Sequence, residues 1–431
     1  MNSQIRTHKQ LWYLAIPVML SNVSVPLLGL VDTAILGHLD DSRYLAAVAM
    51  GSSLVTFVFW SFAFLRMGTT AMVAKHYDHP IKRQGVLQSA GLLALGIGIC
   101  VMAISQPLIQ LMLSLVSPVE GIVPLSERYL SIRFYFAPIS LLNYAALGYL
   151  IGMGRTRDTL IILISSNILN GLLNYILVYW YHLNSDGVAY ATNAAESVQL
   201  LLALAFIRPA LFSLESFNFA KVFFKSFLQL NGHLFVRTFF LLFTFAFFMS
   251  KGAQHSAALL SANAILINLL MFISNALDGF AIASESLVGQ ALSKRKFKKI
   301  KHVIYVSGIW SFIFAIIFCF VLWIASDHIL RLLTSQEAVL AIVNILNYWL
   351  IFLPIAGFAS YWLDGIYVGL AQAKHMRNSV LFSVFILFLP IQFLFSDWQY
   401  HGLWFAFFAF LLGRAGWQLL TLKSVLHKIE H

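Results

Sequence analysis

Charged residues are scarce in this sequence, and cysteine is almost absent. Of its 431 residues, 10% are charged and 60% are hydrophobic, and the mean hydropathy is +0.81. About a quarter of the residues of an ordinary globular protein are charged, so this composition excludes a soluble globular fold. The only cysteines, Cys100 and Cys319, lie in apolar stretches and are too few for a disulfide framework or a metal site.

Motifs for the common hydrolytic and energy-converting sites are also missing. The chain contains no GxxxxGK[ST] phosphate loop, no HExxH, no CxxC, and no Ser-His-Asp arrangement with local support. We therefore expect no catalytic residues, no bound metal, no cofactor, no ATP and no enzymatic activity. An ion gradient is the energy source that remains for an active membrane protein of this kind.

Apolar stretches long enough to cross a membrane recur along the whole chain. A transmembrane helix needs about 20 mostly apolar residues. We predict twelve such spans, at residues 11–37, 44–68, 85–106, 126–152, 159–181, 187–207, 230–250, 257–288, 303–325, 338–369, 379–395 and 401–421. The expected fold class is an all-α membrane protein.

Lysine and arginine are divided unequally between alternate loops. Twenty of the 28 fall on one side of this topology and four on the other, while Arg66, Arg133, Arg237 and Arg414 lie within spans. The positive-inside rule then predicts that both termini are cytoplasmic, in a bacterial-type inner membrane. The net charge of +11 reflects this topology, so we expect no nucleic-acid partner. The basic run from Lys294 to Lys301 is expected to meet anionic lipid headgroups.

The two halves of the chain repeat each other weakly. MVAKHYD aligns with LVGQALS, and DGVAYA with HGLWFA, at an offset of 215 residues, while the segments around Pro138 and Pro354 align at 216. We predict a six-helix lobe at residues 1–207, a cytoplasmic linker at 208–229 and a second six-helix lobe at 230–431. Two parallel homologous bundles are the build of many secondary transporters.

Polar residues inside the spans of the first lobe are candidates for function, because charge within a membrane is costly. Asp32 lies in the first span, six residues after Pro26. Polar residues reach the same predicted depth from three other spans: Tyr129, Asn170, Asn174 and Thr192, with Glu196 four residues beyond Thr192. We interpret Asp32 as a cation-coupling carboxylate within a polar cluster. A purely structural hydrogen-bond network is the alternative.

The second lobe carries five charged residues within its spans, namely Arg237, Asp278, Glu285, Asp364 and Arg414. Asp278 and Glu285 are seven residues apart and therefore share a helix face. Two arginines among three acids can neutralise one another as a charge network. Structural and ion-coupling roles both remain open for this group.

Four segments resemble the DinF branch of the multidrug and toxic compound extrusion (MATE) transporters. LAIPVMLSNVSVPLLGLVDTAILGHLD is similar to the first-helix signature of that branch, and NILNGLLN, NALDGFAIASESLVGQA and YWLDGIYVG resemble further segments. The resemblance implies a cation-coupled exporter with two six-helix lobes and a central cleft. It also implies that Asp32 binds the coupling ion, and that protonation of Asp32 bends the first helix at a hinge at Pro26.

One departure from that pattern bears on the coupling ion. Asn174 stands where the branch commonly has an aspartate, which favours H⁺ over Na⁺. We therefore predict a monomeric proton-coupled antiporter that exports amphipathic, cationic drugs or toxic compounds, with small-molecule substrates and membrane lipids as its partners. A Na⁺-coupled exporter and a flippase for lipids or lipid-linked precursors remain the alternatives. A major-facilitator carrier fits poorly, because AKHYDHPIKR lacks the Gly/Asp/Arg-rich motif expected between spans two and three.

Overall fold

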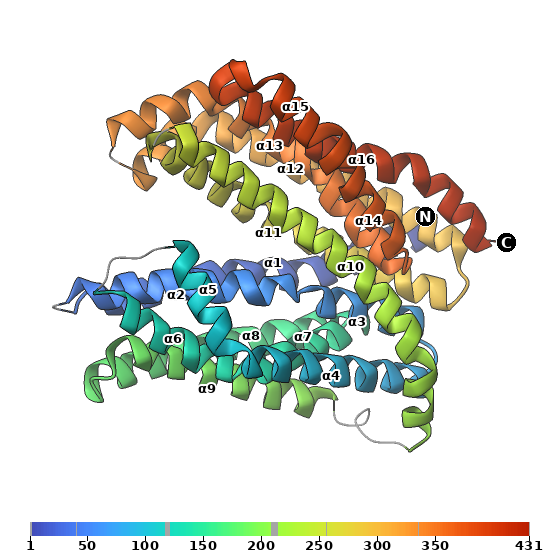
Figure 1. The fold of residues 1–431 in the computed structure, drawn as a ribbon. Coiled ribbons are helices and arrows are strands. Elements are labelled where there is room, and N and C mark those ends of the chain that lie inside the picture. The colour runs from blue at the N-terminus through green and yellow to red at the C-terminus, as the bar shows by residue number, and fades with distance from the viewer. Residues whose placement is uncertain are drawn as a thin grey trace. The chain divides into compact units, whose positions relative to one another are not determined.

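A computed structural model describes residues 2–39, 41–116, 121–207, 214–255, 257–334 and 336–430, and this part of the chain is helical without strands (Figure 1). In the first half the helices are α1 (Asn2–Leu36), α2 (Ser42–Ser61), α3 (Phe64–Lys75), α4 (Pro80–Ala103), α5 (Ser105–Val116), α6 (Val123–Tyr135), α7 (Ala137–Gly152), α8 (Thr156–Tyr175), the π-helix η1 (Ile176–Trp180) and α9 (Asn184–Ile207). In the second half they are α10 (Leu214–His255), α11 (Ala257–Ser293), α12 (Phe297–Leu333), α13 (Glu337–Gly369), α14 (Ala373–Phe382), the π-helix η3 (Ser383–Phe388), α15 (Leu389–Leu394), the short 3₁₀-helix η4 (Ser396–Trp398) and α16 (Gln399–Glu430).

The apolar helices confirm the predicted fold class. Ten helical segments of the described chain are long and apolar enough to cross a membrane, and there are eleven when α6 and α7 are taken as one bent span. Helix α1 has 35 residues, more than the about 20 that a span needs, and contains most of the first predicted span. Each of the twelve predicted spans thus falls on helix.

Two helical segments differ from the prediction. Helix α5 was not predicted, because its 12 residues are too few to cross a membrane. It buries Ile109, Met112 and Leu113, whose spacing defines one helix face, and packs on α6. Residues 214–229 of the predicted linker are helical and begin α10, while 208–213 lie outside the described residues.

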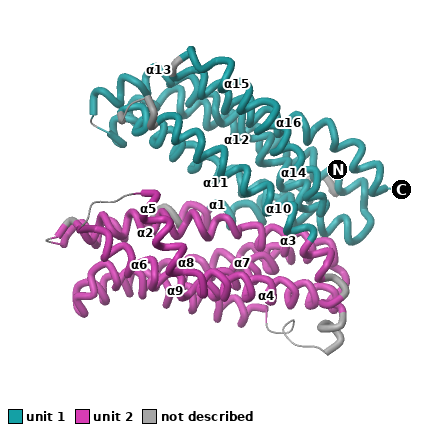
Figure 2. Tube along the Cα trace, in the orientation of Figure 1, with its two compact units in different colours: residues 1–19, 229–431 teal, residues 20–228 magenta. Residues whose placement is uncertain are grey.

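Packing divides the chain into two units, one of residues 1–19 with 229–431 and the other of residues 20–228 (Figure 2). The sequence had suggested 1–207 as one lobe, but the first 19 residues pack with the second half. Aromatic contacts explain this placement, since the ring of Trp12 lies 5.2 Å from Phe280, 4.9 Å from Trp310 and 5.6 Å from Phe314. Helix α1 therefore begins in one unit and ends in the other.

Glycines bring α7 and α3 into close contact in the unit of residues 20–228. A Cβ atom placed on Gly148 would lie 2.6 Å from the carbonyl oxygen of Arg66, and one on Gly152 would lie 2.8 Å from that of Thr70. Only glycine allows two helix backbones to approach so closely. The hydroxyl of Thr70 donates to the Gly148 carbonyl at 3.1 Å and adds a polar contact across the same interface.

The unit of residues 1–19 and 229–431 repeats this interface between α13 and α11. A Cβ atom on Gly365 would lie 2.2 Å from the carbonyl oxygen of Ala281, and one on Gly369 would lie 2.7 Å from that of Glu285. The two glycine pairs are separated by 217 residues, one more than the offset at the prolines of the same segments. The internal repeat is therefore a repeat of helix packing as well as of sequence.

Gly365→Ala should destabilise the protein by about 1–3 kcal/mol, because its methyl group would overlap the carbonyl of Ala281. Gly96→Ala in α4 is the matched control, since a Cβ atom there would meet nothing within 4 Å. Alanine favours helix over glycine by up to about 1 kcal/mol, so the control should be neutral or slightly stabilising. Thermal unfolding of both variants in detergent measures the difference. Equal stability of the two variants would contradict the packing argument.

Candidate functional site

A chain of hydrogen bonds runs from Asp32 in α1 through α8 to α9. Asn174 Nδ2 donates to Asp32 Oδ1 at 2.5 Å and to Asn170 Oδ1 at 2.9 Å. Asn170 Nδ2 donates to Thr192 Oγ1 at 3.0 Å, and the Thr192 hydroxyl donates to the Val188 carbonyl at 2.9 Å. Both asparagines are buried. Each of these hydrogen-bond donors therefore has a defined acceptor, and the series ends at Asp32, the carboxylate predicted to bind the coupling ion.

The sequence of α8 explains why these groups meet. Asn170 and Asn174 are four residues apart and lie on one helix face. The π-helix η1 follows α8 directly and carries Tyr179 to the same side. Three contacts consequently join this face to the second part of α1: Asn167 Nδ2 to Ser24 Oγ at 2.9 Å, Asn174 Nδ2 to Asp32 Oδ1, and the Tyr179 hydroxyl to the Ile35 carbonyl at 2.8 Å.

Pro26, the predicted hinge, lies in α1 between Ser24 and Asp32, the residues of the first two contacts. Helix α1 remains helical through position 26, but the side chain of Pro26 lies outside the described residues. Its role as a hinge stays a prediction.

Tyr129 of α6 joins the same neighbourhood. Its ring fills the space beside Gly51 in α2, where an added Cβ atom would lie 2.5 Å from Tyr129 Cδ1. Tyr129 lies within electrostatic range of Asp32, Arg133 and Glu196. The residues predicted for the polar cluster of the first lobe therefore do come together in the fold, and their role in transport stays a prediction.

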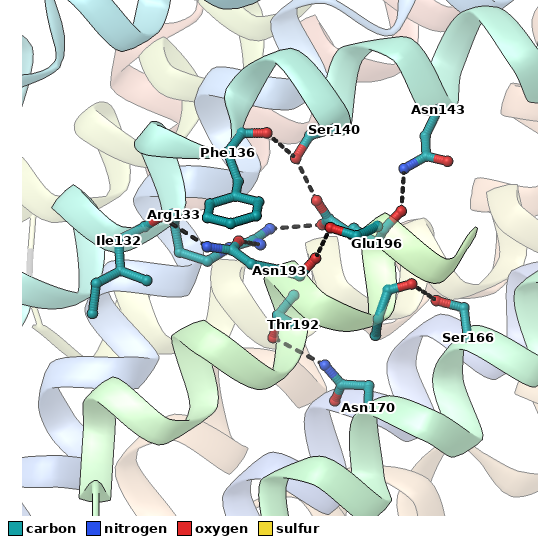
Figure 3. Close-up of polar contacts among 12 residues, drawn as sticks. Ile132, Arg133, Phe136, Ser140, Asn143, Ser166, Asn170, Thr192, Asn193 and Glu196 are labelled. Atoms are coloured by element: carbon teal, nitrogen blue, oxygen red, sulfur yellow. Dashed lines mark hydrogen bonds and ion pairs between the residues drawn. The ribbon is translucent and has the colours of Figure 1, made fainter. Parts of the chain in front are cut away.

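An ion pair that we did not predict lies beside this cluster (Figure 3). Arg133 Nη2 of α6 donates to Glu196 Oε1 of α9 at 2.7 Å, and Nη1 donates to Asn193 Oδ1. The hydroxyl of Ser140 donates to Glu196 Oε2, and Asn143 Nδ2 donates to the Glu196 carbonyl at 2.9 Å. Figure 3 shows Asn193 and Glu196 directed toward Arg133, whereas Thr192 on the same helix is directed toward Asn170.

The bend between α6 and α7 positions this ion pair. The two helices meet at 50° around Phe136, and Pro138 lies in the first turn of α7, where its missing N–H leaves no helical hydrogen bond unmade. Arg133 closes α6 and Ser140 opens α7, so both face Glu196 from either side of the bend. The sequence did contain a signal for the pair, because Arg133 and Glu196 are charges of opposite sign within spans of one lobe. Nothing in the sequence distinguished Ser140, Asn143 and Asn193 from other polar span residues.

In the unit of residues 1–19 and 229–431, Asp364 of α13 is held by two arginines. Asp364 Oδ2 accepts from Arg237 Nη2 of α10 and from Arg414 Nη2 of α16 at 2.6 Å. Asp364 Oδ1 accepts from Gln418 Nε2 at 2.7 Å, one helical turn beyond Arg414. The hydroxyl of Tyr367 donates to the Gln418 carbonyl at 2.7 Å and holds α16 against α13. The carboxylate of Asp364 is thus occupied on both oxygens by donors of the protein.

The other two predicted acids of this lobe lie on α11. Asp278 is within electrostatic range of Tyr361, which is itself in range of Asp364 and Arg414. Glu285 is buried at the glycine-mediated contact between α11 and α13. The structure therefore brings Arg237, Asp364 and Arg414 together in direct contact, with Asp278 and Glu285 on the neighbouring helix.

Comparison with known proteins agrees with this architecture. The MatE family model matches residues 17–176 and 233–394, once in each half of the chain. DNA damage-inducible protein F of Escherichia coli (strain K12) is 37% identical over 416 residues, covering 94% of this chain and 89% of that protein. A probable multidrug resistance protein NorM of Bacillus cereus (strain ATCC 10987) is 24% identical, covering 97% of this chain and 96% of that protein.

A solved structure shares the fold at much lower identity. It is described as "Reverse polarity of binding pocket suggests different function of a MOP superfamily transporter from Pyrococcus furiosus Vc1 (DSM3638)". The TM-score is 0.88 at 18% identity, with 99% of this chain and 97% of that chain covered.

Proposed function

This chain belongs to the MatE family of multidrug and toxic compound extrusion transporters, and we propose that it is a proton-coupled antiporter that exports amphipathic, cationic compounds. The resemblance of its sequence to the DinF branch is confirmed by the match to the Escherichia coli protein. It is an integral membrane protein with the two-lobe fold of the family. The observation that carries the proposal is the buried hydrogen-bond chain that ends on the single carboxylate of Asp32.

Protonation of Asp32 would weaken one of the contacts that hold α1. An ionised carboxylate accepts a hydrogen bond roughly twice as strongly as a neutral group does, so the bond from Asn174 loses strength when Asp32 binds H⁺. Among the side-chain hydrogen bonds of the described residues, loss of this central bond would leave the one from Asn167 in α8 to Ser24 and the one from Tyr179 in η1 to the Ile35 carbonyl.

Pro26 is the proposed hinge because α1 is anchored on both sides of it. The first part of α1 packs through Trp12 in one unit, and the second part is bonded to α8 in the other. A proline inside a helix removes one backbone hydrogen bond and lowers the cost of bending. Pro26→Ala should therefore slow transport while the melting temperature changes little. Unchanged turnover in vesicles would contradict the hinge.

The charge arrangement supports H⁺ over Na⁺ as the coupling ion. Asp364 of the second lobe is occupied on both oxygens by Arg237, Arg414 and Gln418, so this carboxylate is engaged by donors of the protein and is not open to a further cation. In the first lobe Asp32 faces amide and hydroxyl groups, with Asn174 in place of a second acid.

The contacts of the basic loop support the proposed cytoplasmic termini. Lys299 Nζ donates to Gln10 Oε1 at 3.3 Å near the start of α1, and Lys301 Nζ pairs with Glu430 Oε1 at 2.7 Å near the end of α16. Three segments predicted to be cytoplasmic thus meet at one end of one unit. With the positive-inside rule, this supports an inner-membrane protein with both termini in the cytoplasm.

Reconstituted vesicles test the proposal. The purified protein should transport a lipophilic cation in exchange for protons that move down an imposed pH gradient in Na⁺-free buffer, and it should release protons when substrate is added. Transport that requires a Na⁺ gradient and ignores pH would favour the Na⁺-coupled alternative. Movement of fluorescent anionic lipids between leaflets, without cation transport, would instead favour the flippase alternative.

A further inference from the structure

We infer that Arg133 and Glu196 act as a positioning charge pair that sets the pH at which Asp32 exchanges its proton during transport. The inference rests on the proposed proton coupling and adds two residues to it. Neither residue carries the proton in this scheme. Their paired charges determine the electrostatic potential that Asp32 experiences.

Arg133 is placed to act on both Asp32 and Glu196. Its side chain is 5% exposed, and its guanidinium bonds directly to Glu196 at 2.7 Å. It also donates to Asn193, which adjoins Thr192 at the end of the hydrogen-bond chain from Asp32, and it lies within electrostatic range of Asp32. Charges interact far more strongly inside a protein than in water, because the effective dielectric constant is lower. Arg133 therefore influences the charge state of Asp32 although its own ion pair is with Glu196.

The contacts around the pair hold it in this orientation. Ser140 and Asn143 of α7 bond to the side chain and to the carbonyl of Glu196. Asn193 accepts from Arg133 and donates to the Ile132 carbonyl at 2.8 Å. Asn193 also follows Thr192, the last side chain of the chain from Asp32. One turn of α9 therefore carries both the end of the hydrogen-bond chain from Asp32 and the acid of the ion pair.

The charge balance gives the pair its effect. Arg133 and Glu196 together are neutral, so the three-residue group has a net charge of −1 when Asp32 is ionised and zero when it is protonated. Among the described residues, Arg133 and Tyr129 of α6 lie within electrostatic range of Asp32, the neutral amide of Asn174 in α8 donates to it, and Glu196 of α9 pairs with Arg133. Neutralising one member of the pair leaves the other charge uncompensated near Asp32.

Neutralising the acid and neutralising the arginine should therefore shift the pH dependence of transport in opposite directions. Glu196→Gln leaves the positive charge of Arg133 to favour ionised Asp32, so the pH of half-maximal transport should fall by about one unit or more. Arg133→Gln leaves the negative charge of Glu196, so that pH should rise by about the same amount. The double variant should return close to the wild-type value. Proton-driven uptake in vesicles between pH 5 and 9 measures these midpoints.

A second ion pair between the same helices provides the matched control. Arg128 Nη2 of α6 pairs with Asp186 Oδ2 of α9 at 2.6 Å, but the side chain of Arg128 is 73% exposed. Solvent screens such a charge. Arg128→Gln should therefore leave the midpoint unchanged, although it also removes an arginine from α6.

Several outcomes would overturn the inference. Glu196→Gln and Arg133→Gln could lower the transport rate without moving the midpoint, or move it in the same direction, as a merely structural role predicts. If either variant fails to fold, Glu196→Asp and Arg133→Lys serve instead, because they retain the charges. These variants should keep the wild-type midpoint of the pH profile. A shifted midpoint in either of them, once folded, would contradict the inference. Transport by the wild-type protein without pH dependence would refute the proposed function itself. pH-dependent transport whose midpoint is the same in the wild type and in both variants would refute only this inference.

Discussion

Proton-driven export should be abolished in Asp32→Asn, while the protein still folds and inserts into the membrane. Asparagine resembles the protonated carboxyl group in size but cannot exchange a proton. It can still accept the hydrogen bond from Asn174, so the chain through Asn170 to Thr192 is preserved. The variant should therefore fail in coupling and not in stability.

Transport of a lipophilic cation under an imposed pH gradient measures this loss, and thermal unfolding in detergent measures stability. Asp41→Asn is the matched control, because Asp41 caps α2 and pairs with Arg43 outside the predicted spans. Asparagine caps a helix about as well as aspartate, so the control should transport normally. Wild-type export by Asp32→Asn at equal expression would overturn the role given to this carboxylate.

The largest loss of stability should follow from Asp364→Asn. Two arginines share this carboxylate, and the side chain of Arg414 is only 2% exposed. Removing the acid leaves two positive charges buried near each other without their counter-charge. Breaking a buried ion pair by removing one partner costs about 3–5 kcal/mol. The melting temperature in detergent should fall accordingly.

A double-mutant cycle separates direct contact from general damage. Combining Arg237→Ala with Asp364→Ala removes one charge of each sign and should cost less than the sum of the two single changes, with a coupling of about 0.5–3 kcal/mol. Lys301→Gln is the control, because its pair with Glu430 is exposed and should contribute no more than about 1 kcal/mol. Strictly additive losses for Arg237 and Asp364 would mean that these two groups do not interact.

Part of this site was predictable because membranes impose simple rules on sequence. Apolar runs, the bias of lysine and arginine between loops, and a repeat of nearly constant offset each have local signatures. Topological depth then aligned Asp32 with Asn170, Asn174, Thr192 and Tyr129, and the structure brings these residues together. The same rules missed α5, whose 12 residues fall below the length at which hydropathy reports a span.

The predicted depth of a residue in the membrane does not tell which neighbour its helix turns that residue toward. The pairings between buried charges therefore had to come from the fold. Two arginines and three acids in the second lobe allowed several pairings, and the fold pairs Asp364 of α13 with Arg237 of α10 and Arg414 of α16. The bend at Phe136 similarly turns Arg133 toward Glu196.

The sequence by itself thus determined an all-helical membrane protein with two repeated halves and a short set of costly polar residues, because hydrophobicity and charge are local properties. Tertiary structure alone decided that the first 19 residues pack with the second half, and which buried charges touch. Those choices depend on the rotation and close approach of helices distant in sequence, which no single span encodes.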